Sequence, residues 1–509
     1  MKPFALWLGF AAMCLGMFMA VLDIQVVASS LTAIQTALHI PLSQLGWIQT
    51  AYLMAEVVAI PLTGILTRAL SLRYLFAAAT LGFVAASVAC ALSPNFEVLI
   101  AARVVQGFFG GMLIPSVFTA VFVLIPKPHH ILATTMAGVA ALLAPTLGPL
   151  LGGWLTQTQS WHWIFLVNIV PGLAVSLVVL FALAREDTEI SVLKRLDILT
   201  LLLFAVFLAG LQWLLHEAPG HHWRGGFVFG LAGLCILAFA WGVHRALSVA
   251  HPFVHLGRFR NRGFALGCGL SFVLGFGLYG SVYLLSLFLG VVRGHAPLVI
   301  GEILVVSGAA QLITAPVAAW AETRADARLL TALGFALFGF GLIANGFTTL
   351  TSDFDALFWP QALRGLAVMF CLLPATRLAL EYWPPHEVAE ASGLFNLMRN
   401  LGGAMGIAAI DTILTERTPG HVASLVARLQ AGDPLAAALA GLPTGPFHNH
   451  PMGPVDPITK ALIEPMVQRA ALTQSCNEAW WILGALFLLA LLLLPAMPRG
   501  KDYALTNST

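Results

Sequence analysis

The stretch LIAARVVQGFFGGMLIPSVFTAVFVLI (residues 99–125) is long and apolar enough to cross a bilayer, yet Arg103 lies near its start. A guanidinium cannot shed its charge, and placing it toward the centre of a membrane helix costs roughly 2.5–3.5 kcal/mol on insertion scales. A chain keeps such a residue where it faces a bundle interior or a wet cavity. Arg103 therefore indicates a polytopic membrane protein with a transport pathway between its helices.

The composition places most of the chain in lipid. Of its 509 residues, 59% are hydrophobic and 9% are charged, whereas soluble globular chains carry about 25% charged residues. The net charge of +2, without a basic tract, argues against a nucleic-acid partner. The six cysteines lie apart, with no CxxC and no Cys/His cluster, so we expect neither a disulfide framework nor a zinc site.

The sequence lacks the marks of an enzyme or a nucleotide-driven pump. It contains no GxxxxGK[ST] phosphate-binding loop and no soluble region with a nucleophile–base pairing. His216, His221 and His222 lie in one loop without accompanying carboxylates, so no metal site is expected there. We therefore expect no enzymatic activity and no cofactor, which leaves an ion gradient as the energy source.

Runs of about 20 apolar residues, the length needed to cross roughly 30 Å of hydrocarbon, predict the membrane spans. The first run follows Lys2 but ends in LDIQ rather than in a small-residue cleavage site, so we interpret it as a retained span. Fourteen spans are expected, at 5–27, 44–66, 74–92, 97–122, 131–156, 162–183, 197–215, 226–246, 264–289, 298–320, 328–347, 355–379, 389–414 and 479–497.

The distribution of positive charge predicts the orientation. If the N-terminus is cytoplasmic, sixteen lysines and arginines fall on the cytoplasmic side, and the short outer loops receive only Arg224 and Arg293. We therefore expect both termini in the cytoplasm. The segment 415–478 is then a large outer loop with one helix-like piece, and it is either a docking surface for a partner or a flexible loop folded over the bundle.

Two weak internal matches indicate repeated halves. Pro61 precedes Arg73 by twelve residues, as Pro316 precedes Arg328, and QGFFGGMLIP resembles RGLAVMFCLLP. Parallel repeats around a central path are a common construction of secondary transporters. The expected domains are a six-helix bundle at 1–184, a linker with two extra spans at 185–257, and a second six-helix bundle at 258–509 that includes the loop 415–478.

Two carboxylates accompany Arg103 in the predicted membrane region. Asp23 ends the apolar part of the first span, and Glu56 lies near the middle of WIQTAYLMAEVVAIPLTGIL (residues 47–66). A carboxyl group whose burial and charged neighbours change during a transport cycle can take up and release a proton. We therefore assign proton coupling to Asp23, Glu56 and Arg103, although Asp23 could instead cap a helix or pair statically.

The fifth span carries the stretch APTLGPLLGG (residues 144–153). Its glycines share a face that lets another helix approach closely, and its two prolines each remove a backbone hydrogen bond and should bend the helix. A bent helix with a smooth face could be a pivot between two bundles, although simple tight packing is equally consistent. The residues given this conformational role are Pro145, Gly148, Pro149, Gly152 and Gly153.

Other polar residues in the predicted spans are candidates for a substrate cavity or for bonds between helices. Gln311 and Arg364 belong to this wider set. The residues assigned to the cavity are Gln25, Gln49, Gln106, Gln361, Asn396 and Arg399.

These motifs resemble the major facilitator superfamily, in its fourteen-helix drug:proton antiporter branch (EmrB/QacA-like multidrug efflux permeases). LDIQVVASSLTAIQ resembles the first-span motif, whose acidic residue falls on Asp23, and LIAARVVQGFFGG matches the motif that carries Arg103, Gln106 and Gly107. APTLGPLLGG matches the antiporter motif, and WHWIFLVNIVPG (residues 161–172) matches the entry to the sixth span. The resemblance implies a major facilitator fold, an all-α polytopic membrane protein of two six-helix bundles plus two inserted helices.

One motif departs from the family pattern. The loop between the second and third spans normally reads GxLaDrxGRr, whereas this chain reads GILTRALSLR (residues 64–73). Arg68 replaces the acid and Ser71 replaces the glycine, so any gating salt bridge that depends on that acid is in doubt. The departure and the large loop 415–478 are similar to inner-membrane subunits of tripartite pumps, which work with a periplasmic adaptor (membrane fusion protein) and an outer-membrane channel.

We interpret the chain as a bacterial inner-membrane exporter that exchanges protons for hydrophobic or amphipathic drugs by alternating access. One alternative is a stand-alone exporter of a single metabolite, such as an aromatic acid or a siderophore. A second is a membrane scaffold or sensor whose polar residues only hold helices together.

Overall fold

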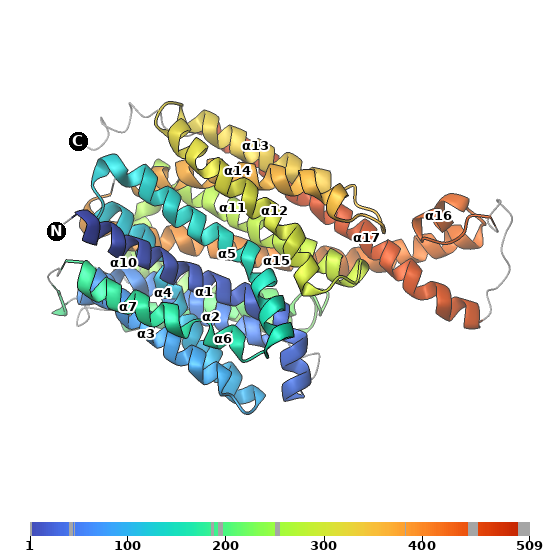
Figure 1. The fold of residues 1–509 in the computed structure, drawn as a ribbon, viewed down its shortest axis with the longest axis horizontal. Coiled ribbons are helices and arrows are strands. Elements are labelled where there is room, and N and C mark those ends of the chain that lie inside the picture. Colours follow the sequence, from blue (N-terminus) through green and yellow to red (C-terminus); the bar gives the residue numbers. More distant parts are fainter. Residues whose placement is uncertain are drawn as a thin grey trace.

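The structure is a computed structural model that describes residues 3–39, 44, 46–184, 188–191, 197–249, 255–381, 383–445 and 457–496. Within these ranges the regular structure is entirely helical, which confirms the predicted all-α class (Figure 1). Residue 185, where the predicted linker begins, lies outside the described residues. So do six of the cations assigned to the cytoplasmic side, namely Lys2, Arg185, Lys194, Arg195, Arg499 and Lys501.

The helices fall into two groups with a helical pair between them. The first group comprises α1 (Pro3–Leu38), α2 (Trp47–Leu70), α3 (Leu72–Ala91), α4 (Phe96–Val123), η2 (Lys127–His129), α5 (His130–Thr158), α6 (Trp163–Leu166) and α7 (Ile169–Ala182). The inserted pair is α9 (Ile198–Glu217) and α10 (Gly226–Ser248). The second group comprises η3 (Leu256–Arg260), α11 (Arg262–Leu287), η4 (Phe288–Val292), α12 (Pro297–Glu322), α13 (Ala327–Asn345), α14 (Phe354–Leu380), α15 (Pro385–Gln430), α16 (Pro434–Leu439), α17 (Pro457–Ala490) and η5 (Leu491–Ala496).

The fourteen predicted spans each fall on a helix or a pair of short helices, but composition supports fewer membrane crossings. Among the described residues, twelve helices are long and apolar enough to span a membrane, or thirteen if α5, bent by 46° beside Pro145, counts as one. The predicted span 389–414 lies in α15 and is absent from that set, because Asn396, Arg399 and Asn400 lower its hydropathy. The count of fourteen is therefore not reproduced, although the chain is a multi-pass membrane protein.

Local sequence explains where several helices begin. Asn95, Asp197, Asn261 and Asp353 each accept a hydrogen bond from a backbone N–H of the helix that follows, as N-cap residues do. The boundary between the predicted ninth and tenth spans is also found as expected. Gly294, with φ of +69°, and Pro297, at the first turn of α12, separate α11 and η4 from α12.

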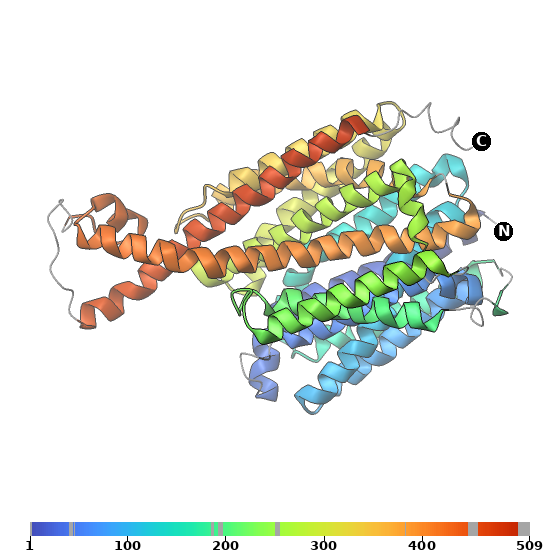
Figure 2. The ribbon, with the colours of Figure 1, turned by 180° about the vertical axis from the view of Figure 1, so that it is seen from behind.

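The two groups of helices meet along two seams. Helix α5 packs along α12, and α2 packs along α15, while the inserted helices α9 and α10 pack on each other and α9 packs on α2. Helix α1 begins and η5 ends at the same end of the bundle (Figures 1 and 2), which we call the termini end. The seams therefore run between the two groups from this end toward the opposite one.

Helices α15 and α17 continue past the bundle at the end opposite the termini, and with α16 they form a projection that we call the hairpin, residues 415–445 and 457–478 (Figure 2). At 1.5 Å per residue, the 46-residue α15 is about 69 Å long, which is more than twice the thickness of the hydrocarbon core. The hairpin has its own small apolar core, which includes Leu425, Ala436 and Ala471. The segment is thus mostly helical and projects away from the bundle rather than folding over it.

Candidate functional site

Arg103 on α4 is fully buried and lies at the centre of a polar cluster between α1, α2 and α4. Its Nη1 donates hydrogen bonds to Asp23 Oδ2 at 2.5 Å and to Gln106 Oε1 at 2.6 Å, and its Nε donates to the carbonyl oxygen of Ile48 at 3.1 Å. Its guanidinium also lies 4.3 Å from the centre of the Tyr52 ring. Arg103, which the sequence predicted to need a polar environment, therefore lies in one inside the first helical group.

Asp23 is the most completely bonded carboxylate of this cluster. Besides Arg103, it accepts hydrogen bonds at its Oδ1 from Gln106 Nε2 and from Asn168 Nδ2, both at 3.0 Å. Asn168 lies in the short break between α6 and α7, so this break delivers an amide to the carboxylate. Three partners, two on α4 and one in the break between α6 and α7, satisfy Asp23, which explains how a carboxylate can remain charged in a buried position.

Close backbone approach holds the cluster together. A Cβ on Gly107 would collide with the carbonyl oxygen of Tyr52, and one on Gly111 would lie 2.6 Å from the carbonyl oxygen of Glu56. Because both obstacles are backbone atoms, no side-chain rotation could make room for a larger residue. The glycines of the Arg103 motif therefore bring α4 against α2 and fix the distance between Arg103 and the α2 residues.

A cavity of about 300 Å³ lies between the two helical groups, in the half of the bundle toward the hairpin. The residues that line the cavity recur on each helix at intervals that place them on one face. Helix α2 contributes Gln49, Leu53 and Glu56, and α15 contributes Asn400, Ala404 and Asp411, so each helix presents one face. The remaining lining residues come from α1, α9, α11 and these same helices: Ile24, Gln25, Leu31, Gly46, Thr50, Val57, Gln212, Leu215, His216, Tyr279, Tyr283, Gly403, Ile407 and Ala408.

Glu56 lines this cavity and links the two groups. It is 2% exposed, and its Oε1 accepts a hydrogen bond from Asn400 Nδ2 of α15 at 3.1 Å. Glu56 therefore bonds the second helical group, and within the described residues it forms no hydrogen bond with Asp23 or Arg103. The three residues assigned to proton coupling form two sites, one inside the first helical group and one at the boundary between the groups.

Of the six residues assigned to a substrate cavity, Gln25 and Gln49 line it. The other four lie in separate clusters: Gln106 bonds Asp23, Gln361 accepts from Arg364 at 2.6 Å, and Asn396 accepts from Arg399 at 2.8 Å. Arg399 is 2% exposed and its guanidinium lies 5.4 Å from the centre of the Phe118 ring. Arg364 and Gln361 on α14 thus repeat the Arg103–Gln106 pairing of α4.

The glycine face of α5 packs against α1. A Cβ on Gly148 would collide with Gln25, and one on Gly152 would collide with Ser29. The expected bend is present at Pro145, where the two parts of α5 meet at 46°. Pro149 and Gly153 lie in the second part of the helix. The arrangement fits close packing, and the pivot role of these residues remains a prediction.

An ion-pair network closes the termini end of the α2–α15 seam. Glu390 of α15 accepts hydrogen bonds from Arg68 Nη1 at 3.1 Å and from Arg258 Nη1 at 2.5 Å, and its Oε2 lies 2.8 Å from His255 Nδ1. We call Arg68, His255, Arg258 and Glu390 the latch. Gly64 makes the approach possible, because a Cβ there would lie 2.8 Å from the Cα of Glu390.

The latch contains the carboxylate that pairs with Arg68, which stands where the family pattern has an acid. Arg68 occupies the position where the family pattern has an aspartate, and the carboxylate is supplied instead by Glu390 of the opposite group. Ser71, in the position of the family's glycine, keeps a glycine-like backbone with φ of +67°. The loop geometry is retained, while the charge at position 68 has the opposite sign to that of the family pattern.

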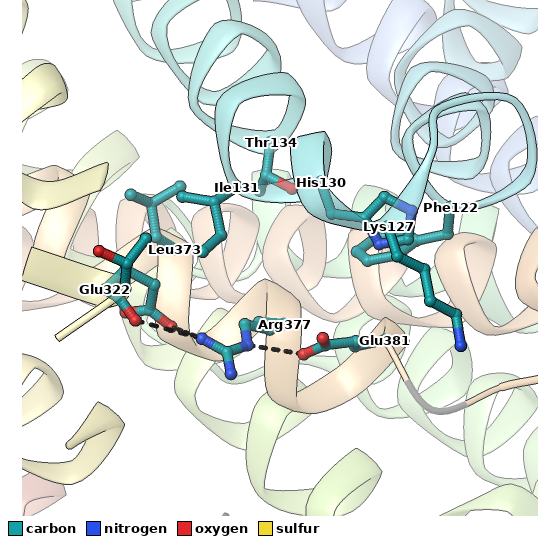
Figure 3. Close-up of a pocket in the computed structure, with 10 residues that line it drawn as sticks. Phe122, Lys127, His130, Ile131, Thr134, Glu322, Leu373, Arg377 and Glu381 are labelled. Carbon is teal, nitrogen blue, oxygen red and sulfur yellow. Dashed lines mark hydrogen bonds and ion pairs between the residues drawn. The ribbon is translucent and has the colours of Figure 1, made fainter. Parts of the chain in front are cut away.

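The α5–α12 seam has a different closure at the same end. A pocket of about 220 Å³ lies between His130 and Ile131 of the first group and Glu322 and Arg377 of the second (Figure 3). Arg377 donates to Glu322 at 3.1 Å and to Glu381 at 2.6 Å. Its charge is therefore neutralised within the second group, whereas Arg68 is neutralised across the seam.

Sequence reasoning missed several residues of the site. It did not single out Asn400, Asp411, Tyr279 or Tyr283 of the cavity, nor Glu390 of the latch. Asp411 had a usable signal, because it lies eleven residues after Asn400, three helical turns along the same face of α15. Glu390 had none, since the register of α15 against α2 is set by packing between distant parts of the chain.

Comparisons with known proteins agree with this architecture. Residues 13–407 match the Major Facilitator Superfamily. The chain is 39% identical to the colistin resistance protein EmrB of Acinetobacter baumannii over 82% of each protein. It is 29% identical to the multidrug export protein EmrB of Escherichia coli (strain K12) over 94% of this chain and 93% of that protein.

Solved structures agree on the fold. The proton:xylose symporter XylE of Escherichia coli superposes with a TM-score of 0.60 at 14% identity, over 98% of this chain and 97% of that chain. At this identity the likeness concerns the fold alone. The sequence match covers more than half of the chain, and the similarity to an EmrB protein is extensive. The chain therefore belongs to the Major Facilitator Superfamily, and within it to the EmrB-like multidrug efflux permeases.

Proposed function

We propose that the chain exports hydrophobic or amphipathic compounds across the bacterial inner membrane in exchange for protons, by alternating access. The observation that carries the proposal is a cavity between two helical groups that contains a buried carboxylate, Glu56, together with the latch, which joins the same two groups at the termini end. Relatives named for colistin resistance and multidrug export support drugs as the cargo. A cavity closed at one end is what an alternating-access cycle requires of one of its states.

The orientation of the molecule follows from the distribution of positive charge. If both termini face the cytoplasm, the latch closes the cytoplasmic end and the cavity belongs to an outward-facing state. Substrate release to the outside would then occur from this state. Opening the latch while the hairpin end closes would expose the cavity to the cytoplasm.

Glu56 is the carboxylate that we assign to proton exchange with the cavity. A proton arriving from outside neutralises Glu56, which weakens its hydrogen bond from Asn400 and its hold on a bound substrate. Loss of that proton to the cytoplasm in the inward-facing state resets the site. Protonation of Asp23 would likewise weaken its attraction to Arg103, so the Asp23–Arg103 pair is the second site at which proton binding changes helix contacts.

The hairpin is the surface that we propose for a periplasmic adaptor, which would connect the exporter to an outer-membrane channel. In the proposed orientation it projects into the periplasm from the end where substrate leaves. Co-purification of the full chain with an adaptor encoded nearby tests this part. Recovery of the exporter alone, with full export activity, would contradict it.

Substrate efflux from cells that express matched variants tests the proposed coupling. Glu56→Gln and Asp23→Asn remove the titratable group while preserving shape, and we expect both to abolish proton-driven efflux with normal expression. Asp355→Asn, at an exposed position in the first turn of α14, is the control and should pump normally. If Glu56→Gln and Asp23→Asn both pump like the wild type, the coupling assignment is wrong.

The same cells separate the proposal from its rivals. A panel of unrelated amphipathic compounds should be exported, whereas export of a single metabolite alone would indicate a dedicated exporter. No efflux of any compound, together with no effect of Glu56→Gln, would indicate a scaffold or sensor.

A further inference from the structure

A further pocket, separate from the transport cavity, lies beside the latch at the termini end. It has a volume of about 600 Å³ and surrounds Arg68, Arg258 and Arg260, and we call it the basic pocket. Three arginines and a histidine line it against two glutamates, so positive charge is in excess. We propose that the basic pocket binds the phosphate of an anionic phospholipid from the adjacent leaflet, with Arg68 and Arg260 as the donors.

The latch leaves donor groups of its arginines unused. Arg68 bonds Glu390 through Nη1, its side chain is 37% exposed, and its Nε and Nη2 form no hydrogen bond within the described residues. Nε of Arg258, a residue that is 8% exposed, likewise has no acceptor there. A phosphate offers several charged acceptor oxygens to such guanidinium groups and can take two N–H groups at once. An anion can therefore bind Arg68 while its bond to Glu390 stays in place.

Arg260 carries a charge that the surrounding protein does not balance. It is exposed at the end of η3 and forms no ion pair in the part of the chain that the structure describes. Both glutamates of the basic pocket pair with Arg258, Glu390 at Nη1 and Glu387 at Nη2. An anionic headgroup beside Arg260 consequently meets a cation whose attraction is not already used by a carboxylate.

The wall that α10 contributes favours a lipid over a soluble anion. Ala246 and Leu247, in the last two turns of this candidate membrane span, line the basic pocket, and Leu247 is 65% exposed. Ile236, eleven residues earlier and so three turns along the same face, is 67% exposed. Helix α10 packs mainly on α9, which leaves this face uncovered by the described residues. An acyl chain attached to a phosphate in the pocket can lie along the face, whereas free phosphate gains nothing from it.

Trp383 indicates the depth of the basic pocket in the bilayer. Tryptophan is enriched where membrane meets water, and Trp383 lines the pocket with its ring 5.5 Å from the Arg258 guanidinium. In the orientation predicted from the positive charges, this end faces the cytoplasm. Basic pockets between helices on the cytoplasmic side are typical sites for anionic headgroups.

Lipid retention by the full chain tests the inference. The protein is placed in nanodiscs that contain equal amounts of phosphatidylglycerol and phosphatidylcholine with identical acyl chains. Native mass spectrometry then identifies the lipids that remain bound after the disc is removed. Both headgroups contain a phosphate, but only phosphatidylglycerol has a net negative charge. We expect the wild type to retain phosphatidylglycerol preferentially, and Arg260→Gln to lower this preference about five-fold.

Matched variants separate the basic pocket from a general attraction to positive charge. Arg260→Lys keeps the charge and should keep most of the preference. Arg324→Gln removes an exposed arginine from the loop between α12 and α13, at the same end of the molecule, and should retain phosphatidylglycerol like the wild type. Because Arg260 lies outside the latch, its replacement leaves the contacts between the two helical groups intact.

A repeat of the measurement with inorganic phosphate, against sodium chloride of equal ionic strength, distinguishes a lipid from a free anion. We expect both salts to leave the same amount of phosphatidylglycerol bound, and selective displacement by phosphate would overturn the assignment to a lipid. Equal retention of the two lipids by the wild type would overturn the inference. So would an equal preference for phosphatidylglycerol in Arg260→Gln and Arg324→Gln.

Discussion

Arg103 illustrates how a permanent charge is accommodated inside a membrane protein. Three acceptors, from α1, α2 and α4, accept hydrogen bonds from its Nε and Nη1, and the Tyr52 ring covers one face of the guanidinium. The geometry uses the planar fork of arginine, since a lysine ammonium offers a single nitrogen to acceptors that lie in different directions. The identity of the side chain, in addition to its charge, therefore determines whether the cluster can form.

We expect Arg103→Lys to reduce export at least about ten-fold while preserving most of the thermal stability, because the charge opposite Asp23 remains. Arg103→Ala should destabilise the fold by about 3–5 kcal/mol, because it leaves the buried Asp23 carboxylate without its cation. Thermal unfolding in detergent and efflux in cells are the two measurements. Wild-type export by Arg103→Lys would show that the fork geometry is unimportant.

At this scale the sequence identified residue types better than their partners. Asp23, Arg103 and Gln106 were all selected, and the structure brings them into contact. Their link to Asn168 and the separation of Glu56 from them depend on how α1, α2, α4 and the α6–α7 break pack together. Such contacts join residues more than a hundred positions apart, so no periodicity within one helix could reveal them.

Among the helical elements, the latch joins the end of α2 to the start of α15 through ion pairs that all meet at Glu390. Arg68→Glu should open the termini end, because it places two carboxylates side by side, and Glu390→Arg should do the same with three arginines. The double variant Arg68→Glu/Glu390→Arg should recover part of the closure. The readout is alkylation of Gln49→Cys by a reagent that is added from the hairpin side.

We expect each single variant to label more slowly than the parent Gln49→Cys protein, since the outward-open cavity becomes less populated, and the double variant to label faster than either single variant. Arg260→Glu, an exposed position in the same region, is the control. Additive slowing in the double variant would show that Arg68 and Glu390 do not act as a pair.

The contacts that join Arg293 and His295 to the start of α14 make the stability of the fold depend on pH in a way that can be measured separately. Asp353, the N-cap of α14, lies outside the membrane spans, and the hydrogen bond from Arg293 followed by that from His295 holds its pKa below the usual range of a carboxyl. Because the folded pKa is lowered, this contribution to stability is complete above pH about 4 and disappears as the pH falls through the folded pKa. The melting temperature of Asp353→Asn should therefore fall less between pH 6 and pH 3 than that of the wild type.

The wild type and Asp353→Asn are compared by thermal unfolding across that range, with Asp355→Asn, two residues along the same helix, as the matched control. If the melting temperature falls equally in all three proteins, the Arg293–Asp353 contact does not make the pH-dependent contribution to stability that we assign to it.

In the molecule as a whole, the hairpin has an apolar core of its own and is attached to the bundle by α15 and α17, so we expect it to unfold separately. Its apolar core does not belong to the main core of the bundle. Leu425→Asp, at a buried position of that core, should expose the hairpin to protease while cavity-ligand binding is retained. Val426→Asp, at the neighbouring exposed position, is the control, and limited proteolysis with mass spectrometry is the measurement.

Loss of cavity binding in Leu425→Asp to the same degree as hairpin cleavage would mean that the two units unfold together. The sequence predicted one helix-like piece within 415–478. It did not predict the other helical residues of that segment, because the neighbouring polar and proline residues favour a loop. Helices α15 and α17 extend through that segment because they pack on each other and on α16, and that packing compensates for a composition that alone favours a loop.

The sequence predicted the helical architecture more directly than it predicted the residues of the cavity and the latch. Long apolar runs require helices, because each helix satisfies its own backbone hydrogen bonds in lipid. The contacts at the latch and at the cavity could not be predicted in this way, since they depend on how the two helical groups pack along the seams. Asp411 and Glu390 acquire their roles only once those seams are formed.

Substrate-driven proton movement in sealed proteoliposomes tests the central claim most directly. With no initial pH difference, a gradient of a transported amphipathic cation is imposed, and a trapped dye reports the internal pH. The account predicts that protons move opposite to the substrate in wild-type vesicles and that Glu56→Gln abolishes this movement. Proton movement in the same direction as the substrate, or undiminished movement in Glu56→Gln, would contradict it.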